Sequence, residues 1–108
     1  MVRLAVALVA PACGIQQLVH ALRFLASPTR LATGCLGCRV WIDESDESIV
    51  RYVEEWATED AMRARVRSDR FTSLLSVVET AREATVHFDF VTQTRGLEYV
   101  AEVRSQGT

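Results

Sequence analysis

The strongest constraint on the fold is that strand-like apolar segments alternate with segments whose apolar residues recur at helical spacing, along the 108 residues. Residues 2–10 form a short, valine-containing apolar run closed by Pro11, which predicts a largely buried strand. From Ile15 the apolar residues recur at helical spacing up to Ser27-Pro28, which predicts a helix that ends there. A chain that alternates between these two periods is expected to pack helices against a sheet.

The remaining segments complete one topology. Strands are predicted over residues 36–42 and 49–56, joined by the acidic turn DESDES. A second helical region begins after the predicted N-cap Thr58, with a break or second cap at Ser68, and residues 85–91 alternate as a fourth strand. The order predicts an α+β, ferredoxin-like βαββαβ fold with a four-stranded antiparallel sheet and both helical regions on one face.

Length and charge narrow the class of protein. The chain is expected to be a single domain over residues 1–108, with 96–108 as a C-terminal extension. A net charge of −2 provides no basic surface for nucleic acid, and no apolar run approaches the roughly 20 residues of a membrane-spanning helix. Three cysteines, an odd number, do not suggest a secreted disulfide framework, so a cytoplasmic location is expected.

The sheet face opposite the helices predicts an oligomer. Its alternating positions include Trp41 or its neighbours and Val53 or Tyr52, which are too apolar to face water alone. Pairing two such sheets face to face in a homodimer would bury them. It would also leave a cavity between the sheet and the helix edge of each subunit.

Two stretches resemble a known family. Residues 33–44 read TGCLGCRVWIDE, and residues 53–71 read VEEWATEDAMRARVRSDRF. The Gly-Cys start of the second strand, the Glu-Glu-Trp end of the third, the acidic helix start and the Ser-x-x-Phe resemble the antibiotic biosynthesis monooxygenase family. The resemblance implies a homodimeric α/β barrel whose pocket lies between the sheet and the second helix. It also implies oxidation of a small aromatic molecule by O2 with neither metal nor flavin, and hence no cofactor.

Arg65 departs from the pattern that this resemblance implies. Family members commonly carry a histidine nine residues after the tryptophan, and here that position is Arg65. Arginine stays protonated, so histidine-dependent deprotonation and haem degradation are both disfavoured. Its forked donors suit a phenolate, a carboxylate or a developing oxyanion. The function expected is a cofactor-independent monooxygenase of a quinol or phenol; the alternative is a non-catalytic, small-molecule-binding or accessory barrel.

The candidate site residues follow from the alternation and from the resemblance. Trp56 would shape the pocket or fill the core, and Arg65 would bind the anion or form an ion pair with Glu54 or Glu55. Tyr52 or His87 would handle protons, His87 only if its strand face lines the interior. The expected catalytic set is Trp56, Arg65, Tyr52 and His87, and the expected ligand-binding set is Arg39, Trp41 and Phe71.

The Cys-x-x-Cys formed by Cys35 and Cys38 is interpreted as structural. No helix follows it, as thiol–disulfide enzymes require, and on a regular strand the two side chains would point to opposite faces. A zinc site would need a second ligand pair, and only the isolated Cys13, His20 and His87 remain. No metal site is therefore expected.

Overall fold

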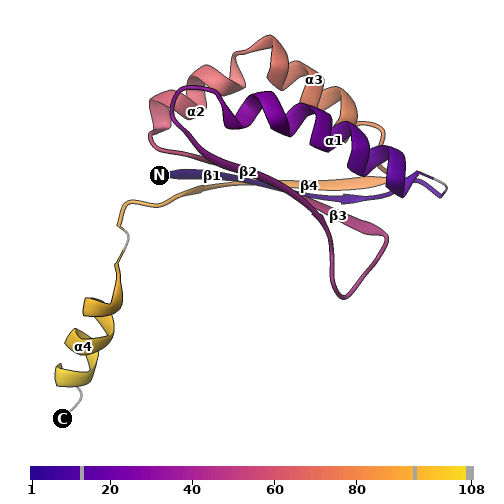
Figure 1. Cartoon of the computed structure of the whole chain (residues 1–108). Helices are drawn as coiled ribbons and strands as arrows, with labels where there is room; N and C mark the ends of the chain where they lie inside the picture. Colours follow the sequence, from indigo (N-terminus) through magenta and orange to yellow (C-terminus); the bar gives the residue numbers. More distant parts are fainter. Residues whose placement is uncertain (13, 94, 107–108) are drawn as a thin grey trace.

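A computed structural model describes residues 1–12, 14–93 and 95–106, so Cys13 and the last two residues of the predicted extension lie outside the described residues. The elements follow the predicted order, with one additional helix at the end (Figure 1). They are β1 (Val2–Val9), α1 (Ile15–Arg30), β2 (Cys35–Ile42), β3 (Ile49–Trp56), α2 (Glu59–Val66), α3 (Asp69–Val78), β4 (Glu83–Phe90) and α4 (Leu97–Gln106).

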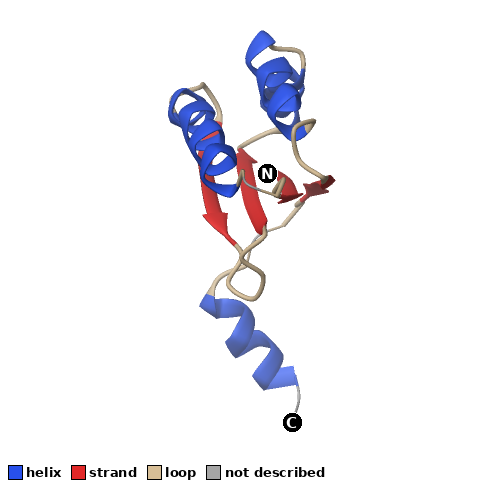
Figure 2. Ribbon diagram, turned by 90° about the vertical axis from the view of Figure 1, so that its right-hand side faces the viewer, coloured by secondary structure: helices blue, strands red, loops and turns tan. Residues whose placement is uncertain are grey.

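The four strands form one antiparallel sheet in the order β2-β3-β1-β4. Helices α1, α2 and α3 all cover the same face, and α4 lies apart from them beyond the end of β4 (Figures 1 and 2). This confirms the predicted ferredoxin-like α+β fold. No helix in the described ranges is long and apolar enough to cross a membrane.

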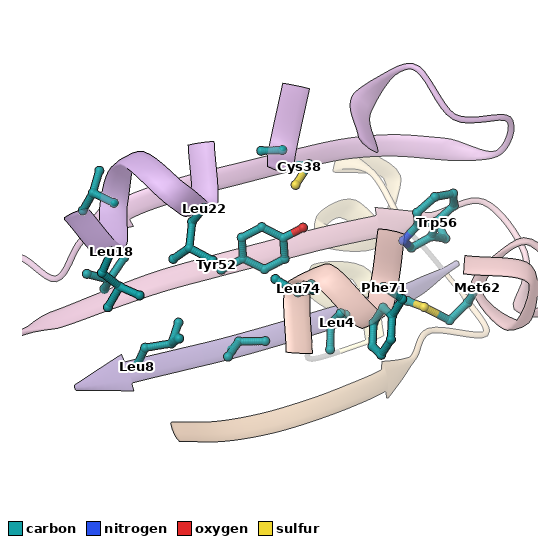
Figure 3. Packing of buried hydrophobic residues seen from close by; sticks show 14 of the residues in the cluster. Leu4, Leu8, Leu18, Leu22, Cys38, Tyr52, Trp56, Met62, Phe71 and Leu74 are labelled. Atoms are coloured by element: carbon teal, nitrogen blue, oxygen red, sulfur yellow. The ribbon is translucent and has the colours of Figure 1, made fainter. Parts of the chain in front are cut away.

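The core lies between the helices and the sheet (Figure 3). Even-numbered residues of β1 and β3 point into it, among them Leu4, Leu8 and Tyr52, and they meet Leu22 of α1 and Leu74 of α3. The period of two in the strands and of 3.6 in the helices therefore directs apolar side chains to one shared layer.

Helix α1 is longer than predicted. It continues through Pro28 to Arg30, although proline removes one helical hydrogen bond. Two hydrogen bonds hold this last turn. The hydroxyl of the buried Thr29 donates within the helix to the carbonyl of Leu25 (2.8 Å), and Arg30 Nε donates to the carbonyl of Cys38 in β2 (2.8 Å). The prediction that the helix ends at Pro28 was wrong, because these anchors outweigh the proline.

Helices α2 and α3 are separated by a cap, as the sequence predicts. The Thr58 hydroxyl accepts from the backbone N–H of Ala61 (3.1 Å), and the Ser68 hydroxyl accepts from that of Phe71 (3.2 Å). The Ser68 hydroxyl also donates to the carbonyl of Arg65 (2.6 Å). Ser68 thus caps the start of α3 and also binds the last turn of α2 through the carbonyl of Arg65.

A bulge in β2 changes which way its cysteines face. Cys35 pairs with Trp56 and Cys38 pairs with Glu54, with a register shift between Cys35 and Gly37. The extra residue places both cysteines on the helix side, where Cys38 is buried and Cys35 packs against the core. The expectation of opposite faces was wrong, because it assumed regular alternation.

Candidate functional site

Glu54 is a carboxylate in the middle of a buried strand face. Val50, Tyr52, Glu54 and Trp56 alternate on the helix side of β3, and the Glu54 side chain is 0% exposed. The Tyr52 hydroxyl and the Trp56 ring nitrogen point toward one another along the strand (Figure 3). Glu54 lies between them in the sequence and accepts a hydrogen bond from each, 2.9 Å long from Trp56 Nε1.

Arg65 reaches Glu54 from α2. Its Nε donates to Oε1 (3.0 Å) and its Nη2 donates to Oε2 (2.8 Å), a forked pair in which both side chains are almost fully buried. The guanidinium also lies 5.5 Å from the centre of the Phe71 ring. Glu54 therefore takes two donors on each oxygen. No buried side-chain nitrogen or oxygen among the described residues lacks a partner.

This arrangement fixes the charge of each group. Burial, together with the negative charge of Glu54, raises the pKa of the Tyr52 phenol far above its usual value. Burial disfavours the charged form of Arg65, but its hydrogen bonds and attraction to Glu54 outweigh burial and leave its pKa above the ordinary value. Near neutral pH the site therefore holds a neutral phenol and a permanent cation.

A pocket of about 320 Å³ opens beside this network. Trp56 and Arg65 form part of its wall, so it is named here the Trp56–Arg65 pocket. The other lining residues come from the end of α1 and the loop after it, from α2, and from the start of α3: Pro28, Thr29, Ala32, Thr33, Ala61, Ala64, Ser68 and Arg70. The two charged residues of the lining are both arginines: Arg65 is paired with the buried Glu54, whereas Arg70 is exposed.

Close approach of the backbone shapes one edge of the pocket. Gly34 has φ of +85°, and a Cβ built there would lie 2.7 Å from the Cβ of Ala61. The Ala57 N–H donates to the Gly34 carbonyl (2.8 Å), which ties the start of β2 to the end of β3. Glycine is needed here for its positive φ and for the lack of a side chain.

The predicted site residues divide between the two faces of the sheet. Tyr52, Trp56, Arg65 and Phe71 come together on the helix side, where Trp56 and Arg65 line the pocket and Tyr52 supports them through Glu54.

The other three predicted residues lie on the opposite face. In the ladder Arg39 pairs with Val53, Val53 with Ala5, and Ala5 with His87, and the Arg39 guanidinium lies 5.4 Å from the centre of the Trp41 ring. His87 does not reach the Trp56–Arg65 pocket.

The cysteines do not form a reactive site on this geometry. Burial raises the pKa of the Cys38 thiol to about 11 and also raises that of Cys35, so both are protonated near neutral pH. Within the described residues no group of three or more histidine, cysteine or acidic side chains is placed to hold a metal ion.

Several pocket residues were not predicted. Glu54 was considered only as a partner of Arg65, although its place between Tyr52 and Trp56 on one strand face signalled a buried carboxylate. Ser68 was predicted only as a cap, and Arg70 carried no signal of its own. Thr29 was assigned to a loop, because α1 was predicted to end at Pro28, and Thr33 lies in the predicted loop but carried no signal for the pocket.

Comparison with solved structures shows the same fold in several proteins. An antibiotic biosynthesis monooxygenase crystal structure superposes with a TM-score of 0.71 at 20% identity, covering 86% of this chain and 100% of that one. A candidate antibiotic biosynthesis monooxygenase from Deinococcus radiodurans gives 0.78 at 20% identity, covering 89% and 97%. Rv0793 from Mycobacterium tuberculosis gives 0.76 at 14% identity, covering 88% and 98%. At these identities the likeness concerns the fold alone.

Sequence comparison adds the family. Among curated proteins, no sequence matches this chain significantly. The family model for antibiotic biosynthesis monooxygenases matches residues 1–75, which run from β1 into α3 and include Glu54, Trp56 and Arg65. The chain belongs to the antibiotic biosynthesis monooxygenase family.

Proposed function

We propose that this protein is a cofactor-independent monooxygenase that binds a small phenol or hydroquinone as its anion in the Trp56–Arg65 pocket and oxidises it with O2. The observation that carries the proposal is the pairing of an aromatic wall, Trp56, with a guanidinium that Glu54 holds in place. A pocket of about 320 Å³ is at the small end of the size range of ligand pockets, which suits one or two rings.

The first chemical task is to form the anion. A free phenol has a pKa near 10, as tyrosine does, and a nearby positive charge favours its ionised form. The exposed guanidinium of Arg70 supplies that charge at the pocket wall, whereas the charge of Arg65 is already balanced by Glu54. The proton leaves to water, since Tyr52 already donates its own proton to Glu54.

The oxidation then balances without a further reductant. The bound phenolate gives one electron to O2, and the phenoxyl radical and superoxide combine at a ring carbon to form a hydroperoxide. Loss of the ring proton and cleavage of the O–O bond release water and leave a quinone. One oxygen atom of O2 enters the product and the other enters water. The Arg70 guanidinium stabilises the phenolate oxyanion before electron transfer and the developing negative charge on oxygen when the quinone forms.

Oxygen labelling tests this reaction. With 18O2 and a panel of phenols and hydroquinones, the expected product is a quinone that carries one labelled oxygen, with one O2 consumed per substrate. Release of hydrogen peroxide without label in the quinone would show simple oxidase chemistry and would contradict the proposal. Ala64→Trp, which fills the pocket from a solvent-exposed position, should abolish the labelled product.

Arg70 offers a test of the anion site that spares the buried network. Arg70→Ala removes an exposed lining cation and should raise the KM for an acidic phenol by about ten- to a hundredfold, the range for a charge-assisted hydrogen bond. The matched control is Arg23→Ala, which removes an exposed arginine of α1 outside the pocket. An equal effect of both variants would mean that general surface charge, not the pocket, attracts the substrate.

A second candidate is ligand binding without turnover. It is favoured by one specific observation: the described lining of the Trp56–Arg65 pocket contains neither a histidine nor a carboxylate that could accept a proton. In that case phenolic anions should raise the melting temperature of the protein, and oxygen uptake should stay at the background rate.

The proposed assembly is a homodimer that pairs the uncovered sheet faces. Trp41 is 37% exposed on this face, where it pairs with Arg51 across the strands and lies beside Arg39, and the central strands add the apolar residues Val53 and Ala5. Trp41→Ala should weaken dimerisation at least tenfold if the ring packs against the partner, as central aromatic residues do in interfaces. Sedimentation velocity measures this, and an unchanged dissociation constant would place the interface elsewhere.

A further inference from the structure

A second surface remains uncovered on the helix side, away from the Trp56–Arg65 pocket. It is a groove of about 390 Å³ between α2 and β4, called here the α2–β4 groove. Its lining residues are Glu59, Met62, Arg63, Val66, Arg67, Phe88 and Phe90. The helices cover β1 and β3 but leave β4 bare, so Phe88 is 40% exposed and Phe90 is 59% exposed. Two neighbouring exposed phenylalanines are unusual on a free surface.

Helix α4 carries a matching apolar face. At 100° per residue, Tyr99, Val103, Val100 and Leu97 follow one another around an arc of about 160°. All four are exposed, and α4 buries none of its residues. A helix of this length is marginal in water by itself, so its formation calls for a surface on which to pack.

The charges beside the two surfaces are complementary. Glu102 lies about 60° from Tyr99 on one flank of the apolar face, and Arg104 lies near the other end of the arc, about 20° from Leu97 on the side of Val100. The groove carries Arg67 directly after α2, and Arg63 within α2 is paired with Glu59 at the start of that helix (3.7 Å). Next to α4 in its own chain, Arg95 is paired with Glu102, and Arg67 of the groove is a cation that can replace Arg95 in this contact.

The position of α4 identifies the copy of the chain that it meets. α4 lies on the side of the sheet opposite to α1, α2 and α3, whereas its own α2–β4 groove opens on the helix side (Figures 1 and 2). Two sheets stacked face to face lie about 10 Å apart, so a helix on the uncovered side extends into the partner's layers. We propose that α4 docks its apolar face into the α2–β4 groove of a second copy of this chain, in a reciprocal exchange.

Hydrogen exchange of the α4 amides tests this docking directly. In an undocked helix of ten residues the amides exchange quickly, whereas docking should slow their exchange at least tenfold. The expected protection is present at high protein concentration and disappears on dilution to monomer. Protection that does not depend on concentration would show that α4 folds back onto its own chain. Absence of protection at any concentration would show that it does not dock. Either result overturns the proposal.

Two variants and a mixture separate exchange between copies from other effects. Val66→Glu disrupts the groove and Val103→Glu disrupts the helix face, and each alone should lose the protection. In a 1:1 mixture, the intact α4 of the Val66→Glu chain meets the intact groove of the Val103→Glu chain, so its protection should return. The two α4 peptides differ in mass and are read separately. Failure of the mixture to restore protection contradicts exchange between copies.

The control and the readout keep this result distinct from the proposed reaction. Leu75→Glu places the same charge on a 44% exposed position of α3 outside the groove and should leave α4 protected. Oxygen uptake plays no part in the measurement, so loss of the proposed reaction would leave it unaffected. The Trp41→Ala variant shows whether pairing of the sheet faces is needed for the docking.

Discussion

The two faces of β3 place the same kinds of side chain in opposite environments. On the helix side, Glu54 is fully buried and binds Arg65 and the Trp56 ring nitrogen. On the other side, the next residue, Glu55, meets Arg3 at 3.5 Å with both side chains partly exposed. The Glu54–Arg65 pair is held by packing and positions the side chains around it. In the Glu55–Arg3 pair, water can replace either partner as a hydrogen-bonding group. Of these two charged pairs, only the buried one, from which solvent is excluded, holds a candidate site residue in a fixed position.

The largest expected effect comes from removing the buried carboxylate. Glu54→Ala leaves the Arg65 charge buried without a partner and should lower the free energy of unfolding by about 3 to 5 kcal/mol. The matched control, Glu55→Ala, should cost less than about 1 kcal/mol. Urea denaturation measures both. Similar losses of unfolding free energy for the two variants would contradict the difference in burial between the Glu54 and Glu55 side chains.

The next effect concerns the two glycines around the bulge of β2. Gly34→Ala combines an unfavourable positive φ with overlap onto Ala61 and should cost about 2 to 4 kcal/mol. At Gly37 an added Cβ meets nothing within 4 Å, so Gly37→Ala should be nearly neutral. The double variant Gly34→Ala/Ala61→Gly should recover only the part due to overlap. Full recovery of the free energy of unfolding would show that the positive φ at position 34 imposes no cost on alanine.

The two tryptophans provide a smaller test of the same contrast. Trp56→Phe keeps an aromatic ring but removes the hydrogen bond to Glu54, and should cost about 2 kcal/mol. Trp41→Phe keeps a ring beside Arg39 and loses no hydrogen bond to a described residue, so its cost should stay below about 1 kcal/mol. Thermal and chemical unfolding of both variants check this order.

The smallest effect is a dependence on pH at the β2–β3 hairpin. Hydrogen bonds from Arg51 and Ser45 lower the pKa of the partly exposed Asp43 carboxyl to about 2, from an ordinary value of 3.8. Because the folded pKa is the lower one, the stabilisation is present above pH 3.8 and is lost as the pH falls through about 2. Asp43→Asn should flatten the acid limb of the stability curve slightly. Added salt should reduce the difference, as expected for a partly exposed pair.

The sequence predicted the fold better than the site for identifiable reasons. The alternation of apolar and polar residues predicted all four strands, and the capping residues Thr58 and Ser68 predicted where α2 and α3 begin. Both signals are local in the sequence. Deviations from local rules caused the errors: the bulge reversed the face of one cysteine, and contacts of Thr29 and Arg30 extended α1 past Pro28. The Trp56–Arg65 pocket draws on the end of α1, so its lining could not be assembled from the motif of β3 and α2 alone.

The direction of the alternation was the remaining unknown. Periodicity grouped Tyr52 with Trp56, and Arg39 with Trp41, but the sequence did not show which group the helices cover. The structure places Arg39, Trp41 and His87 on the uncovered face. That choice depends on the handedness of the crossovers and on packing across the whole sheet, which no single segment encodes.

The forked pair between Glu54 and Arg65 also limits how this sequence can change. A histidine, which the family resemblance led us to expect at position 65, has no forked pair of donors for a carboxylate, so one substitution there would leave the buried Glu54 without this pair of hydrogen bonds. Positions 54 and 65 should therefore vary together across related sequences, eleven residues apart, with glutamate retained where arginine is present. Replacing the Glu54–Arg65 pair by a histidine at position 65 therefore requires a coordinated substitution at position 54.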